Sequence, residues 1–594
     1  GRGARRLLTW RNATIGGLAA ALAWAAVATA WLVLGGPPRS RAAAGPGSEG
    51  EAVASIAALP FANLSADEDD RYFTDGIHEE ILSQLAGISA LHVISRTSVM
   101  AYRDTEKRLS EVADELGVRY ILEGSVRRFQ DRVRVTAQLI DAETDGHVWA
   151  DSYERDRGDL FALQAEVARE IAGSLRAELT PEEQRRIERR PTADQEAYDL
   201  FLRARAIGSG ASTPETLAAA ERLYELALER DPQFLEALAE LTHVGLLARW
   251  SGYDRSPERV EWAEALVERA ERLDPHAGPT HYARGFLHYY GYRDFDAALR
   301  EFEAAVEAGV PGARPAMAYI LRRLGRWDEH LSVLRAELAH DPLNADLARN
   351  LAESLAQMGR YEEAVEMAQR ALELAPSSGR IYWDAAEALL LAGAPERART
   401  LLENAPRRTG GPSALTYAWY AVSRTARAYD DGILHIDASG LEWIDLQGVV
   451  VPTATLSARL YRLAGNGSEA EEALARAESL LAERLRDARE DPAVHAGAML
   501  VAGTAGDAEG VRSAWARVGA LYPVERDALL GARFRLQAAR AFAWAGADGE
   551  AVTLLEVIMA AEAAPVSPAW LRLDPDWDGL RELPRFRELA REAT

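Results

Sequence analysis

The feature that most constrains the fold of this chain is a recurring spacing of about 34 residues in its second half, which we call the repeat length. The triplet Gly-Arg-Trp at 325–327 recurs one repeat length later as Gly-Arg-Tyr at 359–361, and Pro342 is followed at the same distance by Pro376. Glycine and proline mark helix ends, because glycine reaches left-handed conformations and proline cannot continue a helix. After Pro191 the alternating patterns of strands nearly vanish. A fixed period of this length predicts stacked helix–turn–helix units.

Small residues lie at matching positions before the prolines that close these helices. A pair of alanines precedes each of Pro232, Pro275 and Pro376 at the same two distances, namely Ala220 and Ala227, Ala263 and Ala270, and Ala364 and Ala371. Two alanines two helical turns apart share one helix face and let a neighbouring helix approach closely. Together with the period, this pattern resembles the tetratricopeptide repeat. The alternative is an alanine-rich helical bundle with chance spacing.

A different pattern precedes the repeats. Short apolar runs bounded by turn residues predict buried strands, and apolar stripes at helical period predict amphipathic helices. The expected elements are strands at 55–61 and 91–95, helices at 71–88 and 109–117, a hairpin of strands at 118–129 and 132–141, a strand at 147–154 and a helix at 163–179. This order, βαβαβββα, predicts one α/β domain.

Several motifs of this domain resemble, in order, the TolB amino-terminal-like domain. They are "SIAALPFANLSADEDDRYFTDGIHEEILSQLAGI", "HVISRTSVMAY", "LGVRYILEGSVRR" and "VRVTAQLIDAETDGHVWADSYERD". In bacterial proteins with this domain, a transmembrane helix commonly precedes it and tetratricopeptide repeats follow it. The resemblance also implies that a cytoplasmic effector often precedes the membrane helix: a winged-helix DNA-binding domain, a nucleotide cyclase or a protein kinase. The resemblance implies no catalytic residues for this chain.

The N-terminal segment has the composition of a membrane span. Residues 13–36 are uncharged and apolar, and their core from Thr14 to Leu34 is long enough to cross a bilayer as a helix. Four arginines precede the span and two follow it, a bias that places the N-terminus in the cytoplasm. We therefore expect a single-pass protein of the bacterial inner membrane whose bulk is periplasmic. A cleaved signal peptide is the alternative, because "RAAAG" offers a small-residue cleavage site.

The chain is expected to divide into consecutive parts. They are a cytoplasmic stub at 1–12, a transmembrane helix at 13–36, a linker at 37–54, the TolB-like α/β domain at 55–180, a connector at 181–193, tetratricopeptide repeats at 194–410, and degenerate helical repeats with a C-terminal cap at 411–594. Residues 430–452 fit no repeat, and their form is left open.

Composition and motifs argue against catalysis. The formal net charge of −24 makes nucleic-acid binding by this chain unexpected, and the absence of cysteine removes thiolate metal sites and cysteine nucleophiles. No phosphate-binding glycine loop, GxSxG elbow or HExxH pair occurs. The segment 574–579 resembles the opening of a calcium loop, but Arg585 stands where the bidentate glutamate is needed. We expect no enzyme activity, no cofactor and no metal.

The candidate binding site is the inner face of the repeats. Stacked helix pairs curve, and the first helix of each pair lines the concave side. If Pro376 is position 32 of its repeat, this lining includes Asp346, Arg349, Asn350, Glu353 and Gln357. Asn350 then resembles the asparagine that holds a peptide backbone in carboxylate-clamp repeats, although the flanking lysine of such clamps is missing. A solvated helix face is the alternative.

The sequence thus predicts a non-enzymatic, membrane-anchored module that binds protein or peptide partners through a helical-repeat groove. The alternative is the sensory half of a transmembrane signalling protein whose cytoplasmic effector lies upstream of Gly1. Neither the partner nor the oligomeric state follows from the sequence.

Overall fold

The first part of the described chain is an α/β region. The computed structural model describes residues 54–65, 70–129, 132–156, 160–208, 213–254, 256–406, 410–446 and 448–591. The first elements are β1 (Ala54–Ala58), β2 (Ala62–Asn63), α2 (Asp70–Ala86), β3 (Leu91–Val93), α3 (Arg96–Met100), α4 (Leu109–Leu116), β4 (Tyr120–Phe129), β5 (Arg132–Asp141), β6 (Gly146–Asp156) and α5 (Leu160–Ser174). Apart from the short β2 and α3, their order is the one expected from the sequence.

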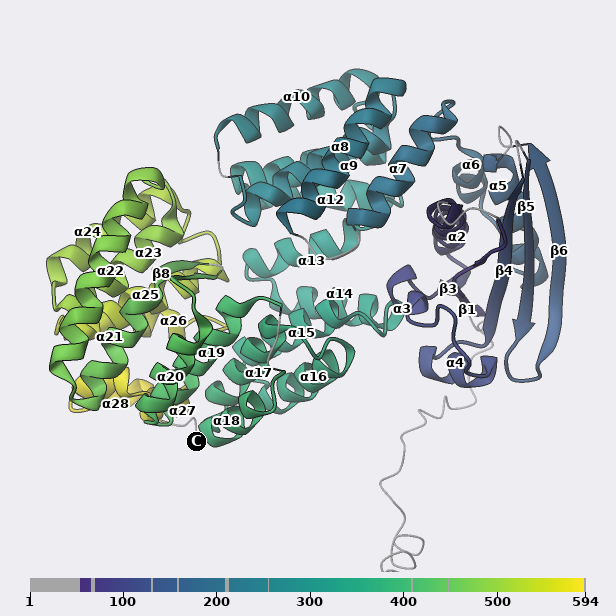
Figure 1. Cartoon of the computed structure of the whole chain (residues 1–594). Coiled ribbons are helices and arrows are strands. Elements are labelled where there is room, and N and C mark those ends of the chain that lie inside the picture. Colours follow the sequence, from purple (N-terminus) through teal and green to yellow (C-terminus); the bar gives the residue numbers. More distant parts are fainter. Residues whose placement is uncertain are drawn as a thin grey trace, which may run out of the picture. The chain divides into compact units, whose positions relative to one another are not determined.

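The sheet combines parallel and antiparallel pairs. Its strand order is β3-β1-β4-β5-β6, with β2 beside β4. Strand β1 runs parallel to β3 and β4, whereas β4, β5 and β6 form an antiparallel meander. Along β5, the buried Val133, Val135 and Ala137 alternate with the exposed Arg132 and Arg134. One face of these strands is therefore covered, by α2 and α5, which also contact each other (Figure 1).

From α6 onward the chain consists mostly of helices, and from α7 onward most of them pack as consecutive pairs. The helices are α6 (Pro181–Glu188), α7 (Gln195–Gly208), α8 (Pro214–Arg230), α9 (Leu235–Trp250), α10 (Glu258–Leu273), α11 (Gly278–Phe286), η2 (Leu287–Tyr292), α12 (Phe295–Glu307), α13 (Ala313–Arg323), α14 (Trp327–His340), α15 (Ala345–Gln357), α16 (Tyr361–Leu374), α17 (Gly379–Leu391), α18 (Pro395–Glu403), α19 (Pro412–Thr425), α20 (Tyr429–Ser439), α21 (Thr453–Ala464), α22 (Gly467–Asp487), α23 (Pro492–Ala505), α24 (Ala508–Leu521), α25 (Leu530–Trp544), α26 (Asp548–Met559), α27 (Pro568–Leu573), η3 (Pro575–Leu580) and α28 (Pro584–Leu589).

The small residues and turn glycines act as the spacing predicts. Each of the six alanines at the matching positions is buried, and none is more than 1% exposed. Gly325 and Gly359, one repeat length apart, follow α13 and α15 with φ angles of 75° and 76°. This left-handed conformation closes a helix at little cost only in glycine. The helical repeat solenoid expected from the sequence is therefore confirmed.

Residues 430–452, which have no repeat pattern, form most of a helix and a hairpin. After α20, β7 (Trp443–Leu446) pairs antiparallel with β8 (Val449–Pro452). Strand β8 lies directly on α23. A Cβ atom at Gly497 of α23 would lie 1.9 Å from the carbonyl oxygen of Val450, so only glycine permits this approach.

The expected membrane placement is corrected. In the part of the chain that the structure describes, no helix is both long and apolar enough to cross a membrane. Even α22, with 21 residues, carries charged side chains along its length. The predicted transmembrane helix at 13–36 lies outside the described residues, as do the stub at 1–12 and residues 37–53 of the linker. The single-pass inner-membrane location with a periplasmic bulk is withdrawn, and with it the membrane as a partner.

Candidate functional site

The five groove candidates share one face of α15 but differ greatly in exposure. The side chain of Asp346 is 83% exposed and that of Arg349 is 16% exposed. Asn350, Glu353 and Gln357 are buried. Only the first turn of this face is therefore open to a partner, and the rest of it points into the interior of the repeat region.

Glu353 is the centre of a buried ion-pair network. Its carboxylate lies 2.7 Å from Arg533, 3.1 Å from Arg322, 3.5 Å from Arg380 and 3.8 Å from Arg349. Burial by itself would raise the pKa of Glu353, but the four arginines hold it well below its usual range. The side chain predicted to line a groove thus stays charged inside the protein.

Arg349 and Asn350 are also held within the repeats. Arg349 donates a hydrogen bond of 3.0 Å to Asp384 of α17, which Arg380 also contacts. The Nδ2 atom of Asn350 donates to the carbonyl oxygen of Asp346, one turn earlier on α15, at 2.8 Å. Asn350 therefore binds its own helix, and its other amide atom, Oδ1, is buried without a hydrogen-bond partner among the described residues.

Some members of this network could have been found from the sequence. Arg380, Asp384 and Glu387 of α17 lie one repeat length after Asp346, Asn350 and Glu353, so the period predicts the same inner face for them. Arg533 lies 180 residues after Glu353 and no repeat pattern connects the two. Its role follows only from the position of α25 opposite α15 and α17.

The end of the chain returns across the ends of three inner helices. We call residues 560–580 the C-terminal strap. It contacts Gln357, Leu391 and Thr425, which end α15, α17 and α19 and follow one another at the repeat length. The contacts are hydrogen bonds from Ala564 N to Gln357 O at 2.8 Å, from Ser567 Oγ to Leu391 O at 2.6 Å, and from Trp570 Nε1 to Thr425 Oγ1 at 3.3 Å. The strap therefore contacts the ends of three inner helices at the repeat length, and it caps terminal carbonyl oxygens of α15 and α17.

The aspartates of the calcium-like segment bind arginines. Arg424 donates two hydrogen bonds to Asp574, at 2.7 and 3.0 Å, and lies 3.1 Å from Asp576, which also contacts Arg459 at 3.1 Å. Burial raises the pKa of Asp574. Within the described ranges, no three histidine, aspartate or glutamate side chains are grouped to hold a metal ion.

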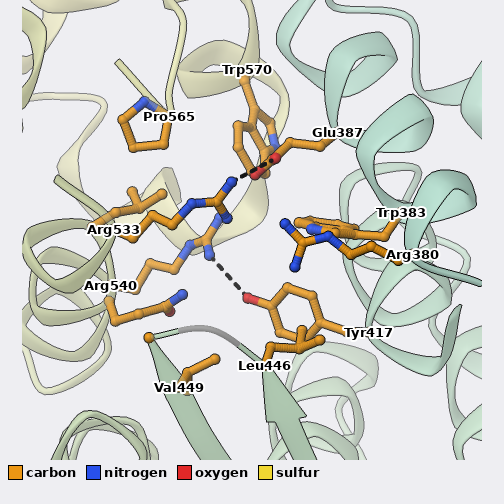
Figure 2. Close-up of a pocket in the computed structure, with 13 residues that line it drawn as sticks. Arg380, Trp383, Glu387, Tyr417, Leu446, Val449, Arg533, Arg540, Pro565 and Trp570 are labelled. Atoms are coloured by element: carbon orange, nitrogen blue, oxygen red, sulfur yellow. Dashed lines mark hydrogen bonds and ion pairs between the residues drawn. The ribbon is translucent and has the colours of Figure 1, made fainter. Parts of the chain in front are cut away.

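A small cavity lies beside this network, between the inner helices and the strap. Figure 2 shows Arg380, Trp383 and Glu387 on one side and Arg533 and Arg540 on the other. The lining is completed by Tyr417 of α19, Leu536 and Gln537 of α25, Pro565, Trp570, and the turn between β7 and β8. Its volume is about 30 Å³, which is room for ordered water or for a group of similar size.

Comparison with protein families supports the repeats. Two tetratricopeptide repeat models match residues 316–378 and 355–416. The chain contains tetratricopeptide repeats. These matches cover α13 to α18, which include the helix that carries the groove candidates. Residues 52–170 match a different model, described as the second domain of HilA/YgeH-like transcriptional regulators.

Individual relatives match parts of the chain. A protein of Rhizobium meliloti (strain 1021) named putative adenylate cyclase 3 is 41% identical over 243 residues, which are 40% of this chain and 41% of that protein. The chain thus spans less than half of this curated relative. Among solved structures, the human IFIT1 dimer with PPP-AAAA is 15% identical, with a TM-score of 0.36 over 78% of this chain and 98% of that one. Pseudomonas aeruginosa pilF is 19% identical, with a TM-score of 0.25 over 42% and 93%.

Proposed function

We propose that this chain is a non-enzymatic interaction module that binds a protein or peptide partner through its tetratricopeptide repeats. Repeats of this kind suggest protein–protein interaction, and the α/β region, assigned as TolB-like from its motifs, would support them. The groove candidates Asp346, Arg349, Asn350, Glu353 and Gln357 remain the proposed site. Their exposure divides them into an entrance, Asp346 and Arg349, and a buried floor.

The observation that carries this proposal is the open first turn of α15. The Asp346 carboxylate is almost fully exposed, and its nearest cation, Arg349, lies 3.5 Å away. Two opposite charges at the mouth of an inner face can bind the charged side chains or the backbone of an extended peptide. The buried floor beneath them holds α15 in place.

The test compares two charge reversals on neighbouring helices. Peptides that bind residues 53–594 are first selected by display, and their affinities are then measured by fluorescence anisotropy. Asp346→Lys should weaken binding at least tenfold, because it reverses the charge at the proposed entrance. Asp328→Lys, at an exposed position of α14, should leave affinity within twofold. Equal affinities for both variants would place the binding surface elsewhere.

A second candidate function is the sensory part of a signalling protein. The observation in its favour is the 41% identity, over 243 residues, to a relative named putative adenylate cyclase 3. In this case an effector, such as a nucleotide cyclase, a winged-helix domain or a protein kinase, is encoded upstream of Gly1. Sequencing the coding region upstream of Gly1 tests this: an in-frame effector domain supports it, and a start codon immediately before Gly1 contradicts it.

A further inference from the structure

The cavity of Figure 2 is lined by more positive charge than its surroundings balance. Arg380, Arg533 and Arg540 face it, and Glu387 is the single carboxylate in its lining. The guanidinium group of Arg533 lies 3.3 Å from the carboxylate of Glu387 and 2.7 Å from the carboxylate of Glu353. We propose that this cavity binds a small oxyanion, a carboxylate or phosphate group, held by these three arginines.

The wider network leaves one of the two ion-pair clusters beside the cavity with an excess of positive charge. Two clusters of ion pairs within the described chain meet at the cavity. One cluster joins Arg322, Arg349, Arg380 and Arg533 to Glu353, Asp384 and Glu387, and the other joins Arg424, Arg459 and Arg540 to Asp574 and Asp576. In the first, arginines and carboxylates balance once the exposed Asp346, which pairs with Arg349, is counted. In the second, three arginines face two carboxylates. Unbalanced buried charge is costly, and a bound anion removes this cost.

Arg540 is the least well paired of these arginines. Its side chain is 4% exposed, yet the nearest oxygens of Asp574 and Asp576 lie 3.8 and 3.7 Å away. Its hydrogen bond to the Tyr417 hydroxyl is long, at 3.4 Å. Guanidinium–carboxylate hydrogen bonds are normally about 2.7–2.9 Å long. An oxyanion in the cavity would give this guanidinium the close acceptor that it lacks.

Gln537 adds a second observation, a buried amide that can donate into the cavity when its side chain is rotated. It lines the cavity and is only 9% exposed, and its Oε1 has no hydrogen-bond partner among the described residues. Buried amide groups normally have partners. Because the two amide orientations are nearly isosteric, a rotated side chain would direct its NH₂ group toward a bound oxyanion.

The volume of the cavity limits the bound part of a ligand to a small group. A volume of about 30 Å³ excludes a large cofactor. The side chains of Arg380 and Arg533 are 28% and 15% exposed, so solvent reaches both of them. The oxyanion can be a free ion or a carboxylate of a bound peptide. The free-ion case does not depend on the proposed function, since it needs no partner protein.

Calorimetry with two probes tests the site. Three ligands are titrated separately into residues 53–594 in chloride buffer at constant ionic strength. They are inorganic phosphate, the peptide N-acetyl-trialanine with a free C-terminal carboxylate, and the same peptide with a C-terminal amide as the control. Saturable one-to-one binding of phosphate indicates a free anion. Binding of the acid peptide but not of its amide indicates a peptide carboxylate, and mutual competition indicates that both use the cavity. If neither probe binds, the proposal is wrong.

Two conservative variants connect binding to the cavity. Gln537→Leu removes an amide whose oxygen makes no hydrogen bond, and Tyr417→Phe removes one long contact, so both should stay folded. Each should weaken binding at least fivefold. Tyr461→Phe, outside the cavity, should leave binding unchanged. Arg540→Met should abolish binding if it folds, and the two milder variants decide the question if it does not. Equal binding by wild type, Gln537→Leu and Tyr417→Phe would overturn the assignment.

Discussion

At the scale of single residues, His330 connects three helices inside the repeats while remaining uncharged. Its ring is fully buried, with Nδ1 2.8 Å from the Ala318 carbonyl oxygen and Nε2 2.8 Å from the Ser354 hydroxyl. Burial lowers the pKa of His330 to about 3, and the nearby Arg322 contributes to this lowering. Above about pH 3 the ring is therefore protonated only in the unfolded chain, which couples this residue to stability in acid.

This coupling predicts a loss of stability between pH 7.5 and pH 5. The unfolded chain takes up a proton below about pH 6.5, whereas the folded chain does not until about pH 3, so falling pH favours unfolding across this window. At pH 5 the contribution of His330 is about 2 kcal/mol. The free energy of unfolding in urea should be measured at pH 7.5 and pH 5 for the wild type and for His330→Gln. Its decrease between the two pH values should be smaller in the variant by about 2 kcal/mol. Parallel pH profiles would contradict the buried neutral histidine.

Gly497 of α23 lets β8 lie directly on this helix because it has no side chain. The carbonyl oxygen of Val450 would lie 1.9 Å from a Cβ at this position, so Gly497→Ala must push β8 off α23. Overpacking of this kind costs about 1–3 kcal/mol. Gly519→Ala, in α24, has no atom within 4 Å of the added carbon and should instead stabilise by about 0.5–1 kcal/mol. Thermal unfolding should therefore shift in opposite directions for the two variants.

At the scale of elements, the C-terminal strap holds α15, α17 and α19 together. Its key side chain is Ser567, whose hydroxyl donates to the Leu391 carbonyl oxygen and accepts a 3.0 Å hydrogen bond from the Trp570 amide. The carbonyl oxygens at the ends of these helices have no partner within their own helix. The strap therefore replaces solvent at the ends of successive repeats.

Ser567→Ala should loosen this arrangement locally. It leaves one buried acceptor and one buried donor without a partner, at a cost of about 2 kcal/mol in the free energy of unfolding. Hydrogen exchange should increase in the last turn of α17 and in α27, and remain unchanged in α2 and β4. The matched variant is Ser513→Ala on the exposed face of α24, which should leave stability unchanged. A uniform increase over the whole chain would contradict a local role of the strap.

At the scale of the whole molecule, the α/β region and the repeats share buried contacts, and residues 53–594 form one compact unit. Helix α2 packs on α7, where Arg205 lies 2.6 Å from Glu79. Burial by itself would lower the pKa of Arg205, but its acidic neighbours hold it above its usual range. Ser98 donates a 2.6 Å hydrogen bond to Asp341, which lies 243 residues later. The two parts should therefore unfold cooperatively.

Gly76 offers a way to uncouple them. A Cβ at this position of α2 would lie 2.5 Å from Leu202 of α7, so Gly76→Val inserts a wedge between the two helices. Gly173→Val in α5 makes the same change of helix propensity where no atom lies within 4 Å. Calorimetry should show one transition for the wild type and the control, and a separate, earlier transition for Gly76→Val. Identical profiles for all three proteins would show that α2 and α7 do not couple the two parts.

The sequence by itself determined the local units of this protein. The succession of strands and helices along the α/β region follows from its apolar patterns, the small positions Ala364 and Ala371 from the helical period, and the turn glycines Gly325 and Gly359 from the repeat length. Such patterns are readable because each is set by neighbouring residues or by adjacent repeats, which contact each other in a fixed way. The same period would have indicated Arg380 and Glu387 as inner-face residues.

Only the tertiary structure decided what the inner face contains. Periodicity placed Asn350, Glu353 and Gln357 on a concave lining but could not show that α25 and the strap cover it. Those contacts join residues far apart in sequence, such as Glu353 with Arg533 and Arg424 with Asp574. Their existence depends on the accumulated curvature of many helix pairs, because a small rotation at each pair sums to the large displacement that brings the chain back on itself.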